Sequence, residues 1–132
     1  ESKIIKDLKS QSHFFKILNG DVMQHYPYGK LFINDDTQNH IRFYNHQISP
    51  TGLLYGAKSV LAKDLAGQIE SKFIDDLLQN ELGSRRFAWI FIDHLEFKYK
   101  EEIANGEFNF SLPKGSYATI LLNLIANREI GI

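Results

Sequence analysis

The sequence contains no cysteine, which excludes disulfide bonds, thiolate metal sites and cysteine nucleophiles. It also lacks a charge excess, since 15 Lys and Arg residues against 16 Asp and Glu residues leave a net charge of −1. A free-standing nucleic-acid-binding domain usually carries a strong basic excess, so only a local basic patch would serve that role here. No apolar run approaches the ~20 residues that span a bilayer, and no signal-type segment opens the chain. We therefore expect a cytoplasmic protein with no membrane partner.

What the sequence does contain is typical of a globular protein. Its 132 residues are 43% hydrophobic and 23% charged, and this balance argues against disorder, collagen or a coiled coil as a description of the whole chain. The first residue is Glu1, so we expect a processed or fragmentary chain.

The first half of the sequence predicts a short helix and a small meander of strands. Ile4, Ile5 and Leu8 fall on one helical face. Asn19-Gly20-Asp21 is a turn signal that favours a glycine with positive φ. A break at Ser49-Pro50-Thr51-Gly52 predicts a loop. The predicted strands cover residues 14–18, 22–26 and 31–33, with a fourth short one around Ile41 and Phe43.

The second half predicts a long helix, a strand hairpin and a final helix. Apolar residues recur every fourth position from residue 57 to residue 80, which is typical of one helix with a wide apolar face, and Gly83 suits its end. Residues 87–92 predict a buried strand. A hairpin is predicted from the alternating residues 95–99, an Asn105-Gly106 turn and residues 107–112. A helix is predicted to follow over residues 117–126.

Several motifs that suggest catalysis fail on spacing. In residues 52–59 only three residues separate the glycines and Ala57 precedes Lys58, so the segment does not fit a phosphate loop and we expect no nucleotide cofactor. No histidine forms a helical pair of the kind that metallohydrolases use, and we assign no metal ligand. Adjacent carboxylates usually diverge into solvent, and no order of residues demands a Ser84, Asp93 and His94 triad. The histidines are His13, His25, His40, His46 and His94, and the adjacent carboxylates are the pairs Asp35-Asp36, Asp75-Asp76 and Glu101-Glu102.

Two segments remain as candidates for contact with a ligand. Arg85 and Arg86 follow Gly83 and Ser84, and two guanidinium groups there could bind a phosphate. A doubled arginine is, however, most often a solvated face or an ion pair, here with Glu81. Residues 110–119 predict a strand end, a tight turn at Gly115 and a helix that Ser116 can cap. A helix N-terminus favours anions, and Tyr117 there would either offer a flat ring to a base or belong to the core.

Four motifs in order resemble the tRNA pseudouridine synthase D (TruD) family. N-G-D-V-M-Q at residues 19–24 resembles the start of a family strand, and the segment 48–56 is similar to its proline- and glycine-rich loop. G-S-R-R at 83–86 and F-S-L-P-K-G-S-Y-A-T at 110–119 resemble its G-x-R-R stretch and its C-terminal signature. Each motif is weak alone, but the ordered set spans most of residues 19–125.

The resemblance implies an enzyme that isomerises uridine to pseudouridine in tRNA, at position 13 in bacterial members, without a cofactor or a metal. It implies an α+β fold of mixed or antiparallel strands. Residues 1–92, with the long helix, would form the second part of an inserted domain. Residues 93–132 would return a strand hairpin and a helix to the catalytic core.

The sequence departs from the family pattern at its most important residue. The catalytic aspartate of the family lies in an N-terminal segment, and neither it nor the N-Y-F-G-x-Q-R-F motif is matched here. The resemblance therefore predicts a C-terminal fragment that is inactive alone, with the missing N-terminal part as its partner beside tRNA. It implies Arg85, Arg86 and Lys114 as RNA contacts and Tyr117 as a wall of the uridine pocket. Two alternatives stay open, a non-catalytic RNA-binding module and a protein-interaction domain.

Overall fold

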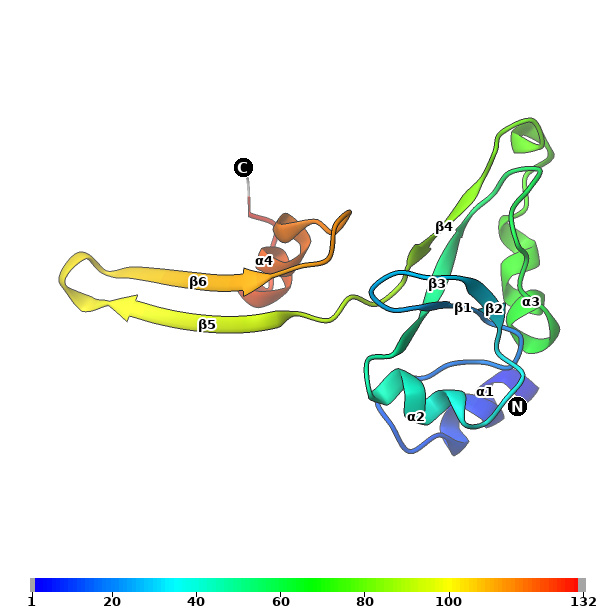
Figure 1. Ribbon diagram of the computed structural model, residues 1–132, viewed down its shortest axis with the longest axis horizontal. Coiled ribbons are helices and arrows are strands. Elements are labelled where there is room, and N and C mark those ends of the chain that lie inside the picture. The colour runs from blue at the N-terminus through cyan, green and yellow to red at the C-terminus, as the bar shows by residue number, and fades with distance from the viewer. Residues whose placement is uncertain (1, 131–132) are drawn as a thin grey trace. The chain divides into compact units, whose positions relative to one another are not determined.

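The structure, a computed structural model, describes residues 2–130 and has an α+β architecture with antiparallel sheets. The chain divides into two compact units, Glu1–Trp89 and Ile90–Ile132, and each is described by itself (Figure 1). In the part of the chain that is described, no helix has the length and apolar character required to cross a membrane.

The first unit is built on a four-stranded antiparallel sheet with the strand order β2-β1-β3-β4. The predicted strands at 22–26 and 31–33 are confirmed as β1 and β2, which pair antiparallel. Its elements are α1 (Lys3–Ser10), β1 (Val22–His25), β2 (Leu31–Ile33), α2 (Asn39–Tyr44), β3 (Ile48–Leu54), α3 (Asp64–Glu70), the 3₁₀ turns η1 (Ser71–Phe73) and η2 (Asp76–Leu78), and β4 (Ser84–Phe87).

The segment predicted as a loop at residues 49–52 is a strand, so that prediction was wrong. β3 changes partner along its length: it pairs with β1 up to Pro50 and with β4 from Thr51 onward. Pro50 lies at this change of partner, and its carbonyl still accepts from the Ala88 N–H at 2.9 Å. A proline has no N–H to donate, and its place at the end of the β1 ladder limits what the sheet loses.

The core of the first unit includes buried side chains on both faces of β1, since the consecutive residues Val22 and Met23 are both buried. α2 contributes two buried residues, Asn39 and Phe43, which are four positions apart and share a helical face. This helical spacing is why the prediction of a short strand at Ile41 and Phe43 was wrong. The buried apolar side chains of this unit are Ile17, Leu18, Val22, Met23, Phe43, Ile48, Leu65 and Ala66.

The long helix predicted over residues 57–80 does not form. α3 covers only Asp64–Glu70, and the two 3₁₀ turns follow it. Tertiary hydrogen bonds occupy the backbone before α3, because Ala57 N donates to the Glu81 carbonyl and Ala62 N to the Glu70 carboxylate. The apolar stripe is also not buried along its length, since Leu77 is 88% exposed. Without a partner for that face, a long helix gains little from packing.

Two further predicted strands in this unit are wrong. Residues 14–18 form no strand because the Gln11 side chain takes the place of a neighbouring strand: its amide accepts from Ile17 N at 3.1 Å and donates to the Ile17 carbonyl at 2.6 Å. β4 begins at Ser84 and ends at Phe87, so residues 88–92 are not the predicted buried strand, and Trp89 is 40% exposed.

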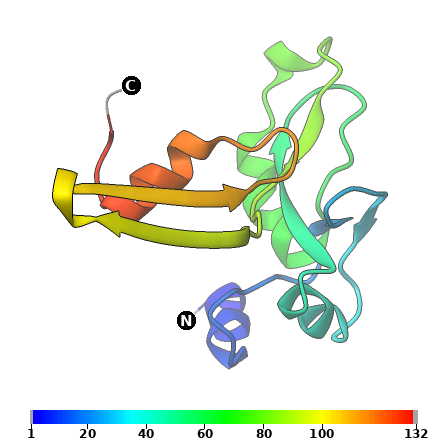
Figure 2. The same cartoon turned by 60° about the vertical axis from the view of Figure 1, so that its left-hand side comes forward.

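The second unit consists of a hairpin and a helix, β5 (Asp93–Lys100), β6 (Asn105–Ser111) and α4 (Ala118–Ala126), with a 3₁₀ turn η3 (Glu101–Ile103) (Figure 2). The predicted hairpin is confirmed, but the turn lies at residues 101–104 and Asn105 and Gly106 pair within the ladder. Tyr117 rather than Ser116 occupies the N-cap of α4, and its side chain makes no cap hydrogen bond. Phe97 and Phe108 pair across the strands with ring centroids 4.6 Å apart.

Candidate functional site

Arg85 is the most deeply buried of the predicted contact residues. It lies on β4 opposite Leu53, and its side chain is 1% exposed. Its guanidinium pairs with the Glu70 carboxylate of α3, while Nε donates to the Val60 carbonyl at 2.8 Å and Nη1 to the Thr51 carbonyl at 3.2 Å. These partners tie the segment before α3, the helix itself and β3 together. The ion pair is therefore with Glu70 and not with Glu81.

Arg86 lies on the opposite face of the same sheet. It pairs in register with Gly52, and its side chain is exposed. Successive strand residues point to opposite faces, so the doubled arginine places one guanidinium inside and one outside. A Cβ built on Gly52 would meet nothing within 4 Å, which shows open space on the side where Arg86 lies.

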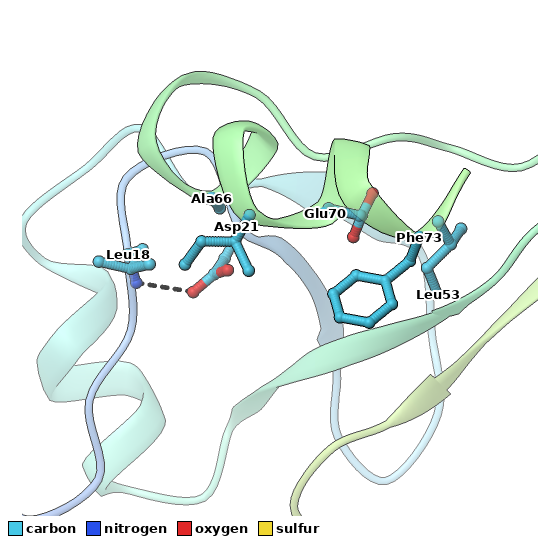
Figure 3. A pocket seen from close by; sticks show the side chains of 7 residues that line it. Leu18, Asp21, Leu53, Ala66, Glu70 and Phe73 are labelled. Carbon is cyan, nitrogen blue, oxygen red and sulfur yellow. Dashed lines mark hydrogen bonds between the residues drawn. The ribbon is translucent and has the colours of Figure 1, made fainter. Parts of the chain in front are cut away.

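Beside Arg85, the first unit contains a pocket of about 280 Å³ between α3, β3 and the segment that leads into β1 (Figure 3). Two carboxylates, those of Asp21 and Glu70, lie among otherwise apolar walls. Asp21 accepts a hydrogen bond from the Leu18 N–H at 2.6 Å. The remaining lining residues are Leu53, Ala66, Ile69 and Phe73.

The pocket changes the acidity of Asp21. Burial raises the pKa of this carboxyl above its ordinary value, the Leu18 N–H opposes that rise, the nearby Glu70 charge increases it and Arg85 reduces it. Asp21 therefore holds a proton to a higher pH than an exposed aspartate does, and in that form it can donate a hydrogen bond. No role for Asp21 or Glu70 follows from the sequence, where Asp21 is visible only as part of a turn and Glu70 as one charge on a helix.

Lys114 and Tyr117 lie together on the loop that precedes α4 in the second unit. The Ser116 N–H donates to the Pro113 carbonyl at 3.1 Å, and Gly115 has a φ of +89°, as the predicted tight turn requires. Both side chains are exposed, Tyr117 by 65%. The ring of Tyr117 is thus accessible on this unit, and the Lys114 ammonium lies three residues away on the same turn.

The remaining candidates stay dispersed. Within residues 2–130, no three histidine or carboxylate side chains gather closely enough to hold a metal ion. The three members of the rejected triad divide between the units, with Ser84 in the first and Asp93 and His94 in the second. His13 and His25 instead contact aromatic rings, those of Tyr44 and Phe32.

With this geometry established, similarity to known proteins identifies the class. Residues 3–125 match the family profile described as "tRNA pseudouridine synthase D (TruD)". A tRNA pseudouridine synthase D from Wolinella succinogenes is 50% identical over 129 residues, and one from Helicobacter pylori (strain ATCC 700392 / 26695) is 46% identical over 133 residues. The alignments cover 97% and 98% of this chain. The chain belongs to the TruD family.

The chain spans only part of the length of these relatives, 36% of the Wolinella protein and 35% of the Helicobacter protein. A crystal structure of a TruD protein from Methanosarcina mazei superimposes with a TM-score of 0.58 at 22% identity, covering 82% of this chain and 31% of that one. At this identity the superposition shows a shared fold. The chain is therefore a member of the TruD family that corresponds to about a third of the length of these two relatives.

Proposed function

We propose that this chain is the C-terminal part of a tRNA pseudouridine synthase that isomerises uridine, at position 13 of tRNA, to pseudouridine. The observation that carries the proposal is the family match over residues 3–125, which includes all four ordered motifs. In the reaction that the family resemblance implies, an aspartate attacks the flipped nucleotide, the bond from the ribose to uracil nitrogen breaks, and the uracil turns and rejoins through carbon. No aspartate here fits the catalytic motif, so the nucleophile is assigned to a segment outside this chain.

The two parts of the chain have different proposed origins. Residues 1–92 are proposed to form the second part of the inserted domain, and residues 93–132 to return to the catalytic core. The division of the chain after Trp89 into two compact units supports such a boundary.

The proposed substrate contacts rest on exposure. Tyr117, with its accessible ring, is proposed to form a wall of the uridine pocket, since an extracted base is held by aromatic side chains. Arg86 and Lys114 are exposed and are proposed to contact the RNA backbone. The internal partners of Arg85 favour a structural role for this residue, so that the RNA contact of the doubled arginine falls to Arg86.

Complementation tests the proposal. The chain alone should release no tritium from tRNA labelled at C5 of uridine, because forming the carbon–carbon bond expels the C5 hydrogen and the nucleophile is missing. Adding the N-terminal fragment of the same protein should restore release, and that fragment alone serves as the control. If the mixture stays silent while the chain alone binds tRNA tightly, the chain is a non-catalytic RNA-binding module. If it does neither, a protein-interaction domain is the better description.

A further inference from the structure

The first unit presents a cluster of one guanidinium and two rings in contact, which we call the Arg42 cluster. It consists of Arg42 on α2, Phe32 on β2 and His25 at the end of β1. The Arg42 guanidinium carbon lies 5.3 Å from the centre of the Phe32 ring, and the His25 ring centroid lies 5.1 Å from the same ring. Arg42 Nη2 is 3.5 Å from His25 Nδ1. None of these residues belongs to the motifs that carry the family resemblance.

A chain of hydrogen bonds from two asparagine side chains holds the guanidinium of this cluster in position. Arg42 Nη1 donates to Asn39 Oδ1 at 3.1 Å, Asn39 Nδ2 donates to Asn34 Oδ1 at 2.9 Å, and Asn34 Nδ2 donates to the Leu18 carbonyl at 2.8 Å. Both asparagines are buried. A chain of buried amides thus orients an arginine at the surface, so little side-chain entropy remains to be lost when a ligand binds.

Arg42 forms no ion pair with any other residue of the described part of the chain. Among residues 2–130, no carboxylate lies within ion-pair distance of it. The nearest acidic residues in sequence are Asp35 and Asp36, and Asp36 accepts from the Gln38 N–H at 2.8 Å instead. Lys30 lies opposite His25, and the backbone N–H of His25 donates to the Lys30 carbonyl at 3.3 Å. The Lys30 side chain is exposed. An arginine that is held in place without a carboxylate partner among residues 2–130, with the exposed Lys30 opposite His25, suits an anion.

We propose that the Arg42 cluster binds a phosphodiester group of RNA, with Arg42 as the forked donor and Lys30 as a second cation. A guanidinium matches phosphate oxygens in two-point geometry and stacks on aromatic faces, which a lysine does not do. In a chain with a net charge of −1, RNA affinity has to come from such local patches. This inference rests on the proposed function, because tRNA is the RNA that the cluster would meet.

The test measures tRNA binding by the complete protein against salt concentration. Arg42→Ala should weaken binding about tenfold or more and lower the slope of log K against log salt by about one. Arg42→Lys should keep the slope and lose several-fold in affinity, since it retains the charge but not the fork. Lys72→Ala, an exposed cation of the same unit, is the matched control and should fall short of the tenfold loss.

Each other outcome has a meaning. A slope for Arg42→Ala equal to that of Lys72→Ala, in a protein that binds and modifies tRNA, overturns the inference and leaves the proposed function intact. A complete protein that neither binds nor modifies tRNA overturns both. If Arg42→Ala lowers the melting temperature, Arg42→Gln, which keeps a donor for Asn39, supplies the slope. An unchanged slope with weaker association of the N-terminal fragment assigns the cluster to protein docking instead.

Discussion

At the scale of single residues, the pairing of Arg85 with Glu70 organises the interior of the first unit. The two side chains are 1% and 15% exposed, so water screens their attraction weakly. Arg85 also satisfies the Val60 and Thr51 carbonyls. Removing one member of a buried pair leaves an uncompensated charge, which costs more than the pair itself contributes.

We therefore expect Arg85→Met to destabilise the first unit by roughly 3–5 kcal/mol. Met keeps most of the apolar length of the side chain, and the loss comes from the stranded Glu70 carboxylate and the two carbonyls. Urea unfolding, followed by circular dichroism, measures the change. Arg86→Met, a neighbouring exposed arginine on the same strand, should stay within about 0.5 kcal/mol of the parent protein. Equal losses for both variants would contradict the structural role given to Arg85.

The doubled arginine also shows which features of the site the sequence alone can predict. The sequence marks Arg85-Arg86 as a candidate, but only the strand register with β3 reveals that one faces in and the other out. The pocket at Asp21 and Glu70 joins residues 49 positions apart through tertiary packing, and the Arg42 cluster joins three elements. No local pattern encodes either arrangement.

At the scale of elements, the sequence predicted those strands that are held by contacts between residues close together in the chain. The sequence predicts β1, β2 and the two strands of the β5–β6 hairpin, although the turn of that hairpin lies at residues 101–104 and not at Asn105-Gly106. The long helix failed because apolar spacing alone did not reveal that the backbone before α3 is bonded elsewhere. The Gln11 amide that replaces a strand neighbour of Ile17 is likewise invisible in the sequence.

The junction between the turn at Gly20 and the start of α3 gives a prediction at this scale. Gly20 has a φ of +88°, donates to the Asn34 carbonyl at 2.8 Å and accepts from Lys63 N at 2.9 Å. A Cβ there would collide with the Lys63 backbone carbonyl. Gly20→Ala should thus cost about 2 kcal/mol or more, from the left-handed backbone and the clash together.

Urea unfolding measures the loss of stability in Gly20→Ala. Alanine variants of two other glycines separate the contribution of the left-handed backbone from that of the clash. Gly52→Ala, in the same unit, has open space and no positive φ, and should change stability little. Gly115→Ala, which lies in the second unit and is therefore measured in the complete protein, has a φ of +89° but also open space, and should lose only the ~1 kcal/mol of backbone strain. A Gly20→Ala loss no larger than that of Gly115→Ala would mean that the α3 junction yields without cost.

At the scale of the whole molecule, the two units differ in how much apolar surface they bury. The first holds eight of the nine buried apolar side chains in the described residues, and the second holds only Leu121. Phe97 and Tyr99 on β5, and Ile120 and Leu124 on α4, are each more than half exposed. A two-stranded hairpin with one helix has too small a core to be stable without further packing.

We expect residues 1–89 to fold on their own and residues 90–132 not to. The isolated first unit should unfold cooperatively in urea, whereas the isolated second unit should show a non-cooperative change and amide exchange close to that of an unfolded chain. Adding the N-terminal fragment should then protect the amides of β5 and β6, because the proposed catalytic core would cover their exposed aromatic side chains. Slow amide exchange in residues 90–132 alone would show that this unit is an independent domain, which does not depend on a core supplied by another part of the protein.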